Sequence, residues 1–196
     1  ERLHYTNGGI RLMSELRTNS IVPKNGIPAG AAGGGIIQVM TANLTATQNI
    51  GSGSVTAGNE YDITNLSLTI TPAKATNKIL VMGHISHYVK DNQQAHFYVK
   101  RGSTIVARGD ADGARFRTLV TAQGNNDYYS EWVVKNTPFF WLDSPATTSA
   151  TVYKVVCVPG VTGSSFIYIN RGERDYEGTN YDARATSNFT IMEVCA

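Results

Sequence analysis

The sequence contains few charged residues, little leucine and no long hydrophobic run. Only 16% of its 196 residues are charged, and 17 basic side chains nearly balance 15 acidic ones. A nucleic-acid groove needs a clustered basic excess, so we expect no nucleic-acid partner. The longest apolar runs, such as Ile79 to Met82, fall far short of the ~20 residues that span a bilayer, so no membrane insertion is expected.

Cysteine is equally scarce. Cys157 and Cys195 are the only two, and both lie inside apolar, strand-like runs. A single pair in a chain of this size is not the dense framework of a disulfide-stabilised protein. We therefore expect two buried free thiols.

Threonine, serine, asparagine and glycine together make up about a third of the chain, and these residues form helices poorly, while threonine favours strands. Short β-type runs recur from Ile36 onward between turns rich in Gly, Asn, Asp and Pro. The pattern predicts an all-β fold, an antiparallel β-sandwich with a jelly-roll-like head. The expected strands are 65–71, 78–90, 97–100, 104–107, 116–121, 128–134, 139–142, 150–158, 165–170 and 188–194.

The expected strand 78–90 has two apolar faces. Residues 79, 81, 85 and 89 line one face, and Leu80, Met82, His84 and Tyr88 line the other. We therefore expect this strand to be covered on both sides, by a second sheet and by another subunit.

The first 35 residues differ from the rest. Two prolines disfavour helix, and the run Gly33-Gly34-Gly35 has no side chain to bury, which is typical of a hinge. We expect an extended N-terminal arm and hinge over 1–35 and a β-sandwich head domain over 36–196. An alternative is that this region forms a first strand and a loop of the head. The positions expected to anchor the arm are Ile21, Val22, Pro23, Ile27 and Pro28.

The sequence contains no arrangement that indicates catalysis, a cofactor or a metal. His84 and His87 point to opposite faces of a strand, and no cysteine or carboxylate stands at a ligand spacing beside them. The stretch Gly109–Gly113 resembles half of a calcium loop, but Arg115 and Arg117 follow it and would repel a cation. We expect a non-enzymatic protein.

Two segments are candidates for binding. In Phe139-Phe140-Trp141, alternation along a strand forces one side chain away from the core, which suggests an oligomer interface. The long polar segment 171–184 is rich in Arg, Tyr and Asn, which recognition surfaces use heavily. Its expected receptor contacts are Arg174, Tyr176, Asn180 and Tyr181. The alternative is a solvated loop closed by internal ion pairs.

A further pattern is carried by several stretches from about Leu16 to the end of the chain, which include Leu16–Pro23, Gly33–Val39, Arg101–Ile105, Leu142–Ser149 and Phe189–Val194. These stretches resemble small tail-fibre-like structural proteins of tailed bacteriophages, of the marine and cyanobacterial type. The resemblance implies a homotrimeric β-sandwich head displayed on a virion. The segment 171–184 is not part of the family pattern.

The resemblance implies a virion protein that mediates host attachment as a fibre or knob. The expected partners are its own copies, tail or capsid proteins contacted by the arm, and a glycan or protein on the host surface. The alternative is a capsid decoration protein whose arm stabilises the shell. Met13 resembles a natural start of such a protein, so residues 1–12 are expected to be an extension or the tail of a preceding segment.

Overall fold

The computed structural model describes residues 2–6, 9–13, 35–124, 132–164, 166–178 and 182–195. Within these ranges the regular elements are all strands, and no α-helix is present, which confirms the all-β prediction. The strands are β1 (Arg2–Thr6), β2 (Gly9–Met13), β3 (Ile36–Leu44), β4 (Gln48–Asn49), β5 (Ser54–Val55), β6 (Tyr61–Ile70), β7 (Lys78–Val89), β8 (Gln94–Arg101), β9 (Thr104–Ala107), β10 (Val120–Gln123), β11 (Lys135–Asp143), β12 (Thr151–Pro159), β13 (Gly163–Ser164), β14 (Ile167–Ile169) and β15 (Ser187–Val194).

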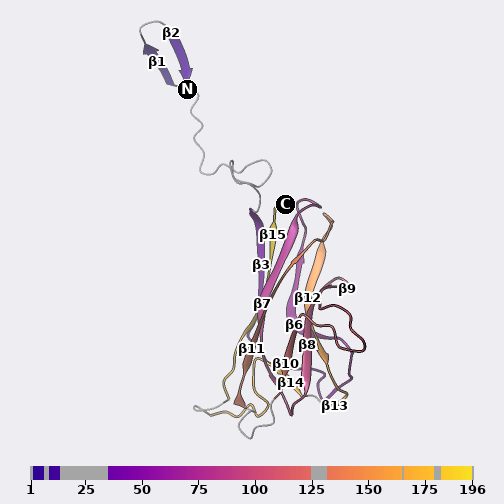
Figure 1. Cartoon of the computed structure of the whole chain (residues 1–196). Coiled ribbons are helices and arrows are strands. Elements are labelled where there is room, and N and C mark those ends of the chain that lie inside the picture. The colour runs from indigo at the N-terminus through magenta and orange to yellow at the C-terminus, as the bar shows by residue number, and fades with distance from the viewer. Residues whose placement is uncertain are drawn as a thin grey trace.

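Two antiparallel sheets pack face to face (Figure 1). The first sheet places β3, β15, β7 and β11 side by side, and β14 and β4 extend it beyond the start of β15. The second sheet has the order β6-β12-β8-β10, with β9 also paired to β8. The chain changes sheet at every step between these eight main strands except from β8 to β10. This strand order is the double Greek key of a jelly roll.

The core lies between the two sheets and consists of inward-facing residues of both. On β7 the inward side chains include Ile79, Val81 and Ile85, none of which is exposed. They meet side chains of the second sheet such as Phe97 and Tyr153, which belong to the same buried cluster. Cys157 and Cys195 are both buried and are not joined in a disulfide, as predicted.

In β6 the side chains alternate regularly after Asn65, but the alternation does not continue across it. Leu66 and Ile70 are fully buried and Leu68 packs against the core, but Ile63, three residues before Leu66, is buried as well. Asn65 has a φ of 65°, and the pairing of β6 with β12 shifts register at this point. A bulge in which asparagine adopts the left-handed conformation lets both apolar residues face inward.

The edge strand beside β8 is interrupted. β9 pairs with residues 99–101 of β8 and β10 pairs with residues 94–97, so the two short strands run along the same edge. The chain between them, residues 108–119, leaves the sheet as a loop. The predicted strand 116–121 is therefore displaced, because residues 116–119 belong to this loop and the strand begins at Val120.

A carboxylate occupies one of the inward positions of β15, whose side chains alternate regularly between buried and half-buried. Glu193 has no exposed surface and faces inward. It accepts hydrogen bonds from Gln38 Nε2 at 2.5 Å, Asn77 Nδ2 at 2.5 Å and the Ala73 amide at 2.7 Å. Burial raises the pKa of Glu193, but these hydrogen bonds outweigh that effect and hold the pKa below its ordinary value. The carboxylate thus ties β3 and the β6–β7 turn to the end of β15.

The N-terminal strands β1 and β2 form an antiparallel hairpin whose register runs from Arg2↔Met13 to Thr6↔Gly9. The five positions expected to anchor the arm, Ile21, Val22, Pro23, Ile27 and Pro28, lie outside the described residues. Their anchoring role and the domain boundary at residue 35 stay predictions.

His84 and His87 point to opposite faces of β7, as the strand period predicts. His84 contacts the Thr186 carbonyl on the outer face at 2.9 Å. His87 is 1% exposed, bonds through Nε2 to Thr137 Oγ1 at 2.7 Å and packs against the Phe97 ring. Burial, and to a smaller degree the Lys135 charge, lower the pKa of His87 from 6.5 to about 4. Its neutral form is therefore part of the folded core.

Acidification should destabilise the fold through His87 before carboxylates titrate. The unfolded chain binds a proton near pH 6.5 and the folded protein only near pH 4, so stability is complete above pH 6.5 and falls as the pH drops toward 4. We expect His87 to account for a loss of about 2 kcal/mol in the free energy of unfolding between pH 7.5 and pH 5. Urea denaturation of wild type and His87→Gln at both pH values measures this. An equal loss in the variant would contradict the assignment.

Candidate functional site

The outer face of the first sheet carries a continuous apolar surface. Cross-strand pairing aligns one side chain from each strand in a single row, Val39–Met192–Leu80–Leu142. In the adjacent row Met82 stands opposite Phe140. We call the surface formed by Val39, Leu80, Met82, Phe140, Leu142 and Met192 the apolar face.

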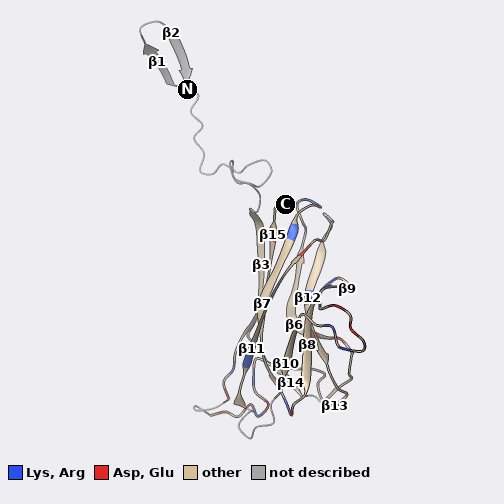
Figure 2. Ribbon diagram, viewed as in Figure 1, with Lys and Arg blue, Asp and Glu red and all other residues tan. Residues whose placement is uncertain are grey.

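Much of the apolar face is open to solvent. Phe140 is 76% exposed, and Val39 and Leu142 are each 54% exposed. The bodies of these strands contain almost no Lys, Arg, Asp or Glu, and charged residues gather in the loops instead (Figure 2). An exposed apolar surface without charges is typical of a site that another molecule covers.

The aromatic triplet on β11 divides between the two faces as the alternation predicts. Phe139 is buried against Phe189 in the core, with ring centroids 6.3 Å apart, whereas Phe140 points outward. Trp141 pairs with the inward-facing Val81 but remains 42% exposed, because β11 pairs with β7 alone among the described strands and so forms an edge of its sheet. Phe140 is thus the member of the triplet that belongs to the apolar face.

At the opposite end of the same sheet the outer face is covered by the segment that follows β14. Asn170 is fully buried and joins three parts of this region. Its Nδ2 donates to the carbonyls of Leu44 and Ala46 at 2.8 and 2.9 Å, and its Oδ1 accepts from Ser187 Oγ at 2.7 Å. The Asn170 carbonyl also accepts from the Ala185 amide at 2.9 Å. Asn170 therefore holds both ends of the segment 171–184, which we call the late loop.

Within the late loop, Arg174 is held by internal contacts. It donates to Asp182 Oδ2 from Nε at 2.8 Å and also from an Nη atom, and the Asp182 side chain is fully buried. The Arg174 guanidinium lies 4.5 Å from the centre of the Trp132 ring and 5.2 Å from that of Tyr176. Both contacts fit cation–π attraction, so Arg174 links Trp132 to the tip of the loop.

Further ion pairs connect the loop to itself and to β7. Arg184 Nη2 lies 3.1 Å from both carboxylate oxygens of Asp175. Lys90, which follows β7, donates to Glu173 at 2.6 Å, and this hydrogen bond raises the pKa of Lys90. The internal ion pairs expected from the sequence as the alternative are present. They do not exclude recognition, because Tyr176 is 62% exposed.

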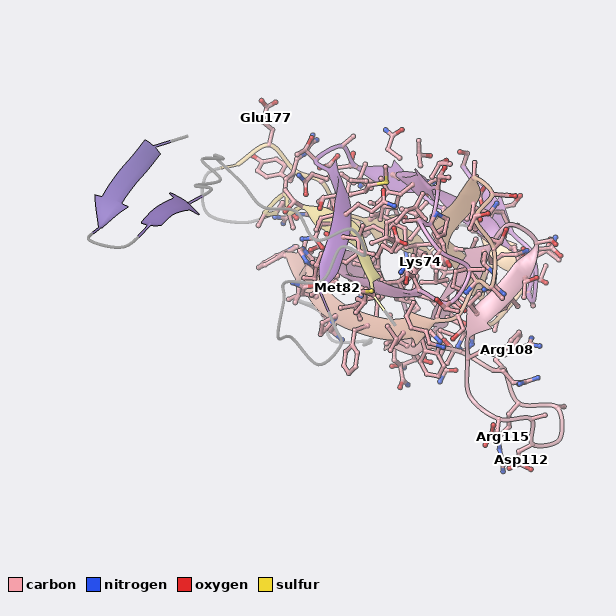
Figure 3. The ribbon with its side chains drawn as sticks, turned by 90° about the horizontal axis from the view of Figure 1, so that it is seen from above. Lys74, Met82, Arg108, Asp112, Arg115 and Glu177 are labelled. Carbon is pink, nitrogen blue, oxygen red and sulfur yellow. The ribbon has the colours of Figure 1, made fainter. Side chains whose placement is uncertain are left out.

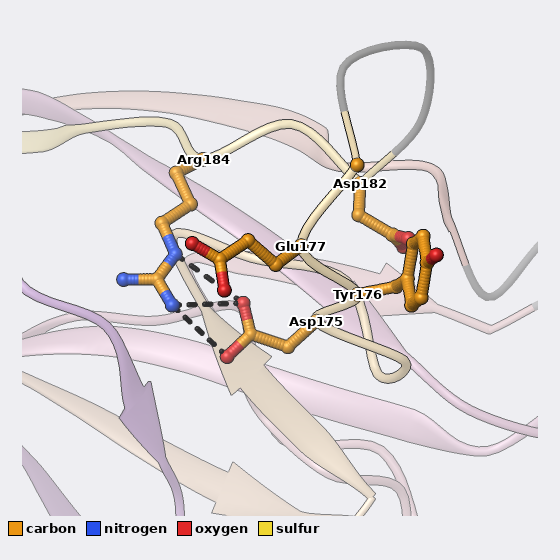
Figure 4. A pocket seen from close by; sticks show the side chains of 6 residues that line it. Asp175, Tyr176, Glu177, Asp182 and Arg184 are labelled. Atoms are coloured by element: carbon orange, nitrogen blue, oxygen red, sulfur yellow. Dashed lines mark hydrogen bonds and ion pairs between the residues drawn. The ribbon is translucent and has the colours of Figure 1, made fainter.

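The late loop encloses a hollow of about 580 Å³ whose charged walls face one another (Figure 4). Asp175, Glu177, Asp182 and Arg184 all line it, together with Tyr176 and Gly178. Asp182 Oδ1 is buried without a hydrogen-bond partner. Of the four expected receptor contacts, Tyr176 lines the hollow and Arg174 pairs with the lining residue Asp182. Asn180 and Tyr181 lie outside the described residues.

The described part of the chain contains no group of three or more His, Cys, Asp or Glu side chains arranged to hold a metal ion. No helix among the described residues is long and apolar enough to cross a membrane. The roles of Asn170 and Glu193 were not predicted from the sequence. A lone polar residue in a strand or beside one does not reveal which distant groups it will contact.

No protein-family model matches the chain, and no curated protein sequence matches it. Among solved structures, it is similar to a chain in the structure of infectious bursal disease virus, Gx strain, at 10% identity and a TM-score of 0.36, covering 92% of this chain and 47% of the viral one. A chain of the Gt strain is similar at 12% identity and a TM-score of 0.34, covering 99% and 62%. The chain thus spans less than two thirds of the length of either viral chain, and likenesses of this size carry no functional conclusion.

Replacing Asn170 should loosen the late loop and destabilise the head. Asn170→Ala removes the hydrogen bonds that this side chain makes to the Leu44 and Ala46 carbonyls and to the Ser187 hydroxyl, at a residue whose φ is 61°. We expect a loss of about 3 kcal/mol in the free energy of unfolding, measured by urea denaturation. Asn65→Ala is the matched control, because Asn65 has the same backbone conformation but is exposed. An equal loss in both variants would mean that the hydrogen bonds of Asn170 contribute nothing.

Proposed function

We propose that this chain is a virion structural protein whose head assembles as a homotrimer on a phage particle and presents the late loop for host attachment. The observation that carries the proposal is the apolar face. Four neighbouring strands supply it in register, and its most prominent side chain, Phe140, lies on an edge strand. A second copy of the chain offers a surface of matching chemistry and is present wherever the first one is.

The geometry of the head supports a division between an anchored end and a displayed end. The chain enters β3 at Ile36, and the last residue of β3, Leu44, accepts a hydrogen bond from Asn170 at the base of the late loop. A strand of nine residues separates these points by about 27 Å. The preceding arm would contact tail or capsid proteins at one end, and the late loop would face the host at the other.

Attachment would then rely on avidity. Three copies of the late loop on one rigid head bind a host surface as a unit, because the second and third contacts form intramolecularly. Weak contacts by side chains such as Tyr176 suffice in such an arrangement. A glycan or a protein on the host surface would serve as the receptor.

One observation favours a second candidate function, capsid decoration. The charged side chains of the late loop are largely engaged with one another, as in the pairs Arg174–Asp182 and Arg184–Asp175. A loop of this kind suits a passive knob on a shell as well as a receptor site. The copy number per virion separates the two functions: a handful of copies fits a fibre, and hundreds of copies fit a decoration protein.

Disrupting the apolar face should dissociate the oligomer without unfolding the head. We expect the wild-type chain to elute in size-exclusion chromatography with light scattering at three times its mass of 21.2 kDa. The double variant Phe140→Ser/Leu142→Ser should weaken association by about 2 kcal/mol or more and elute as a monomer at micromolar concentration. Its circular dichroism should stay unchanged, because both side chains are exposed in the single head.

The matched control for this experiment is Val152→Ser, which removes an exposed apolar side chain from the second sheet. It should remain trimeric. A monomeric wild-type chain, or equal dissociation of both variants, would overturn the assignment of the apolar face.

Loss of the exposed Tyr176 ring should reduce attachment and leave the oligomer intact. The wild-type chain should compete with particles for adsorption to host cells, and Tyr176→Ala should compete at least about tenfold less well, because a recognition tyrosine at an interface contributes on the order of 1–2 kcal/mol per copy. Deleting residues 173–182 should abolish competition. Lys74→Gln, an exposed change outside the late loop, serves as the control. Undiminished competition by the deletion variant would contradict the attachment role.

A further inference from the structure

The loop that interrupts the edge strand of the second sheet covers a cavity on the outer face of that sheet. The loop, residues 108–119, is closed at its base by hydrogen bonds from the Gly109 amide to the Thr118 carbonyl and from the Leu119 amide to the Phe97 carbonyl, both 3.1 Å. Arg115 and Asp112 lie where the loop projects beyond the sandwich, on the side away from Glu177 of the late loop (Figure 3). The loop 108–119 and the late loop therefore lie on different surfaces of the head.

The sheet beneath this loop is apolar on a face where solvent-facing residues are expected to be polar. Tyr98, Val156 and Val158 form a buried cluster there, separate from the main core, and Ile105 and Leu119 pack against it. The loop does not fill the space above this floor. A cavity of about 210 Å³ remains, lined by Tyr98, Ile105 and Val158 below and by Phe116 from the loop.

The described residues that line the cavity carry only positive charge. Arg108, Arg115 and Arg117 all line it, and no carboxylate among the described residues does. Arg117 uses its Nε to reach the Gly109 carbonyl at 2.8 Å, and Arg115 pairs with Asp112 in a contact where both side chains are about three-quarters exposed. An ion pair so exposed to water is weak and exchanges readily for another anion. The three guanidinium groups offer planar donors suited to carboxylate, sulfate or phosphate oxygens.

A histidine on the cavity wall has an unused ring nitrogen. His96 is 5% exposed, and its Nε2 is buried without a hydrogen-bond partner. Its ring stacks on Phe116 with the centroids 4.6 Å apart, and its Nδ1 lies 3.4 Å from Thr121 Oγ1. A buried polar atom without a partner is costly unless a ligand or water satisfies it. His96 and the arginines thus line the same small volume.

We infer that this cavity, which we call the arginine pocket, binds a single acidic sugar residue, with its anionic group held by Arg108, Arg115 and Arg117 and one face of its ring against the apolar floor. The volume is below that of pockets for drug-sized ligands and suits one ring. The walls supply hydrogen-bond donors, which favours a ligand rich in acceptor oxygens. Bare anions lack the apolar ring face that Tyr98, Val158 and Phe116 would contact.

The arginine pocket lies on the outer face of the second sheet, whereas the apolar face belongs to the outer face of the first. A ligand in the pocket would therefore remain accessible in an oligomer built through the apolar face. The inference rests on the pocket and not on the proposed trimer, and the two are tested by separate measurements.

Titration of the purified full chain with glucuronate, followed by NMR, tests the inference. The ring nitrogens of His96 should shift on addition of glucuronate, and the pKa of His96, which burial lowers in the free protein, should rise when the anion is bound. Arg108→Gln should weaken glucuronate binding about tenfold or more, since it removes a charge-assisted hydrogen bond. Lys74→Gln, which removes one positive charge outside the pocket, should bind as wild type does.

Three comparison ligands complete the test. Glucose, which has the ring without the charge, and inorganic phosphate, which has the charge without the ring, should both bind at least about tenfold more weakly than glucuronate. No shift at His96, or equal weakening by Arg108→Gln and Lys74→Gln, would overturn the inference. Phosphate binding as tightly as glucuronate would overturn the assignment to a sugar. Tighter binding of a glutamate-containing peptide would assign the pocket to an acidic protein segment instead.

Discussion

The packing of the second sheet against the inward side chains of β7 determines where every other surface of the head can lie. β7 is paired along both edges, with β15 and β14 on one side and β11 on the other. Its inner residues Ile79, Val81 and Ile85 have no exposed surface. Because side chains alternate along a strand, this core packing places Leu80, Met82 and His84 on the opposite face. The position of the apolar face is therefore set by the packing of the core.

The outer face of the first sheet is used in two different ways. Near the start of β7 the surface is apolar and open, while toward its end it is covered by the late loop, and Tyr88 is 4% exposed there. Asn170 contributes to this difference, because its hydrogen bonds fasten both ends of the late loop to the sheet. The molecule thereby has an open apolar face at one end and a preformed loop at the other.

On the outer face of the second sheet, a loop covers an apolar cluster. The edge strand of this sheet is divided into β9 and β10, and the chain released between them folds over the cluster, which would otherwise face water. The cover is incomplete, and the arginines of the loop surround the remaining cavity. Both outer faces of the sandwich therefore carry apolar side chains where polar ones are expected. We propose a different partner for each: a second copy of the chain for the apolar face and an acidic sugar for the arginine pocket.

The sequence by itself determined the fold class, the two apolar faces of strand 78–90, the outward direction of one side chain in the triplet 139–141 and the burial of both cysteines. These features depend on composition and on the period of two along a strand. Only the tertiary structure decided which residues meet. It placed Glu193 among Gln38, Asn77 and Ala73, tied Asn170 to Leu44 and paired Arg174 with Asp182. It also moved residues 116–119 from a predicted strand into a loop, where Phe116 and Arg117 line a pocket. These contacts join residues far apart in the chain or inside an irregular loop, where no local period exists to predict them.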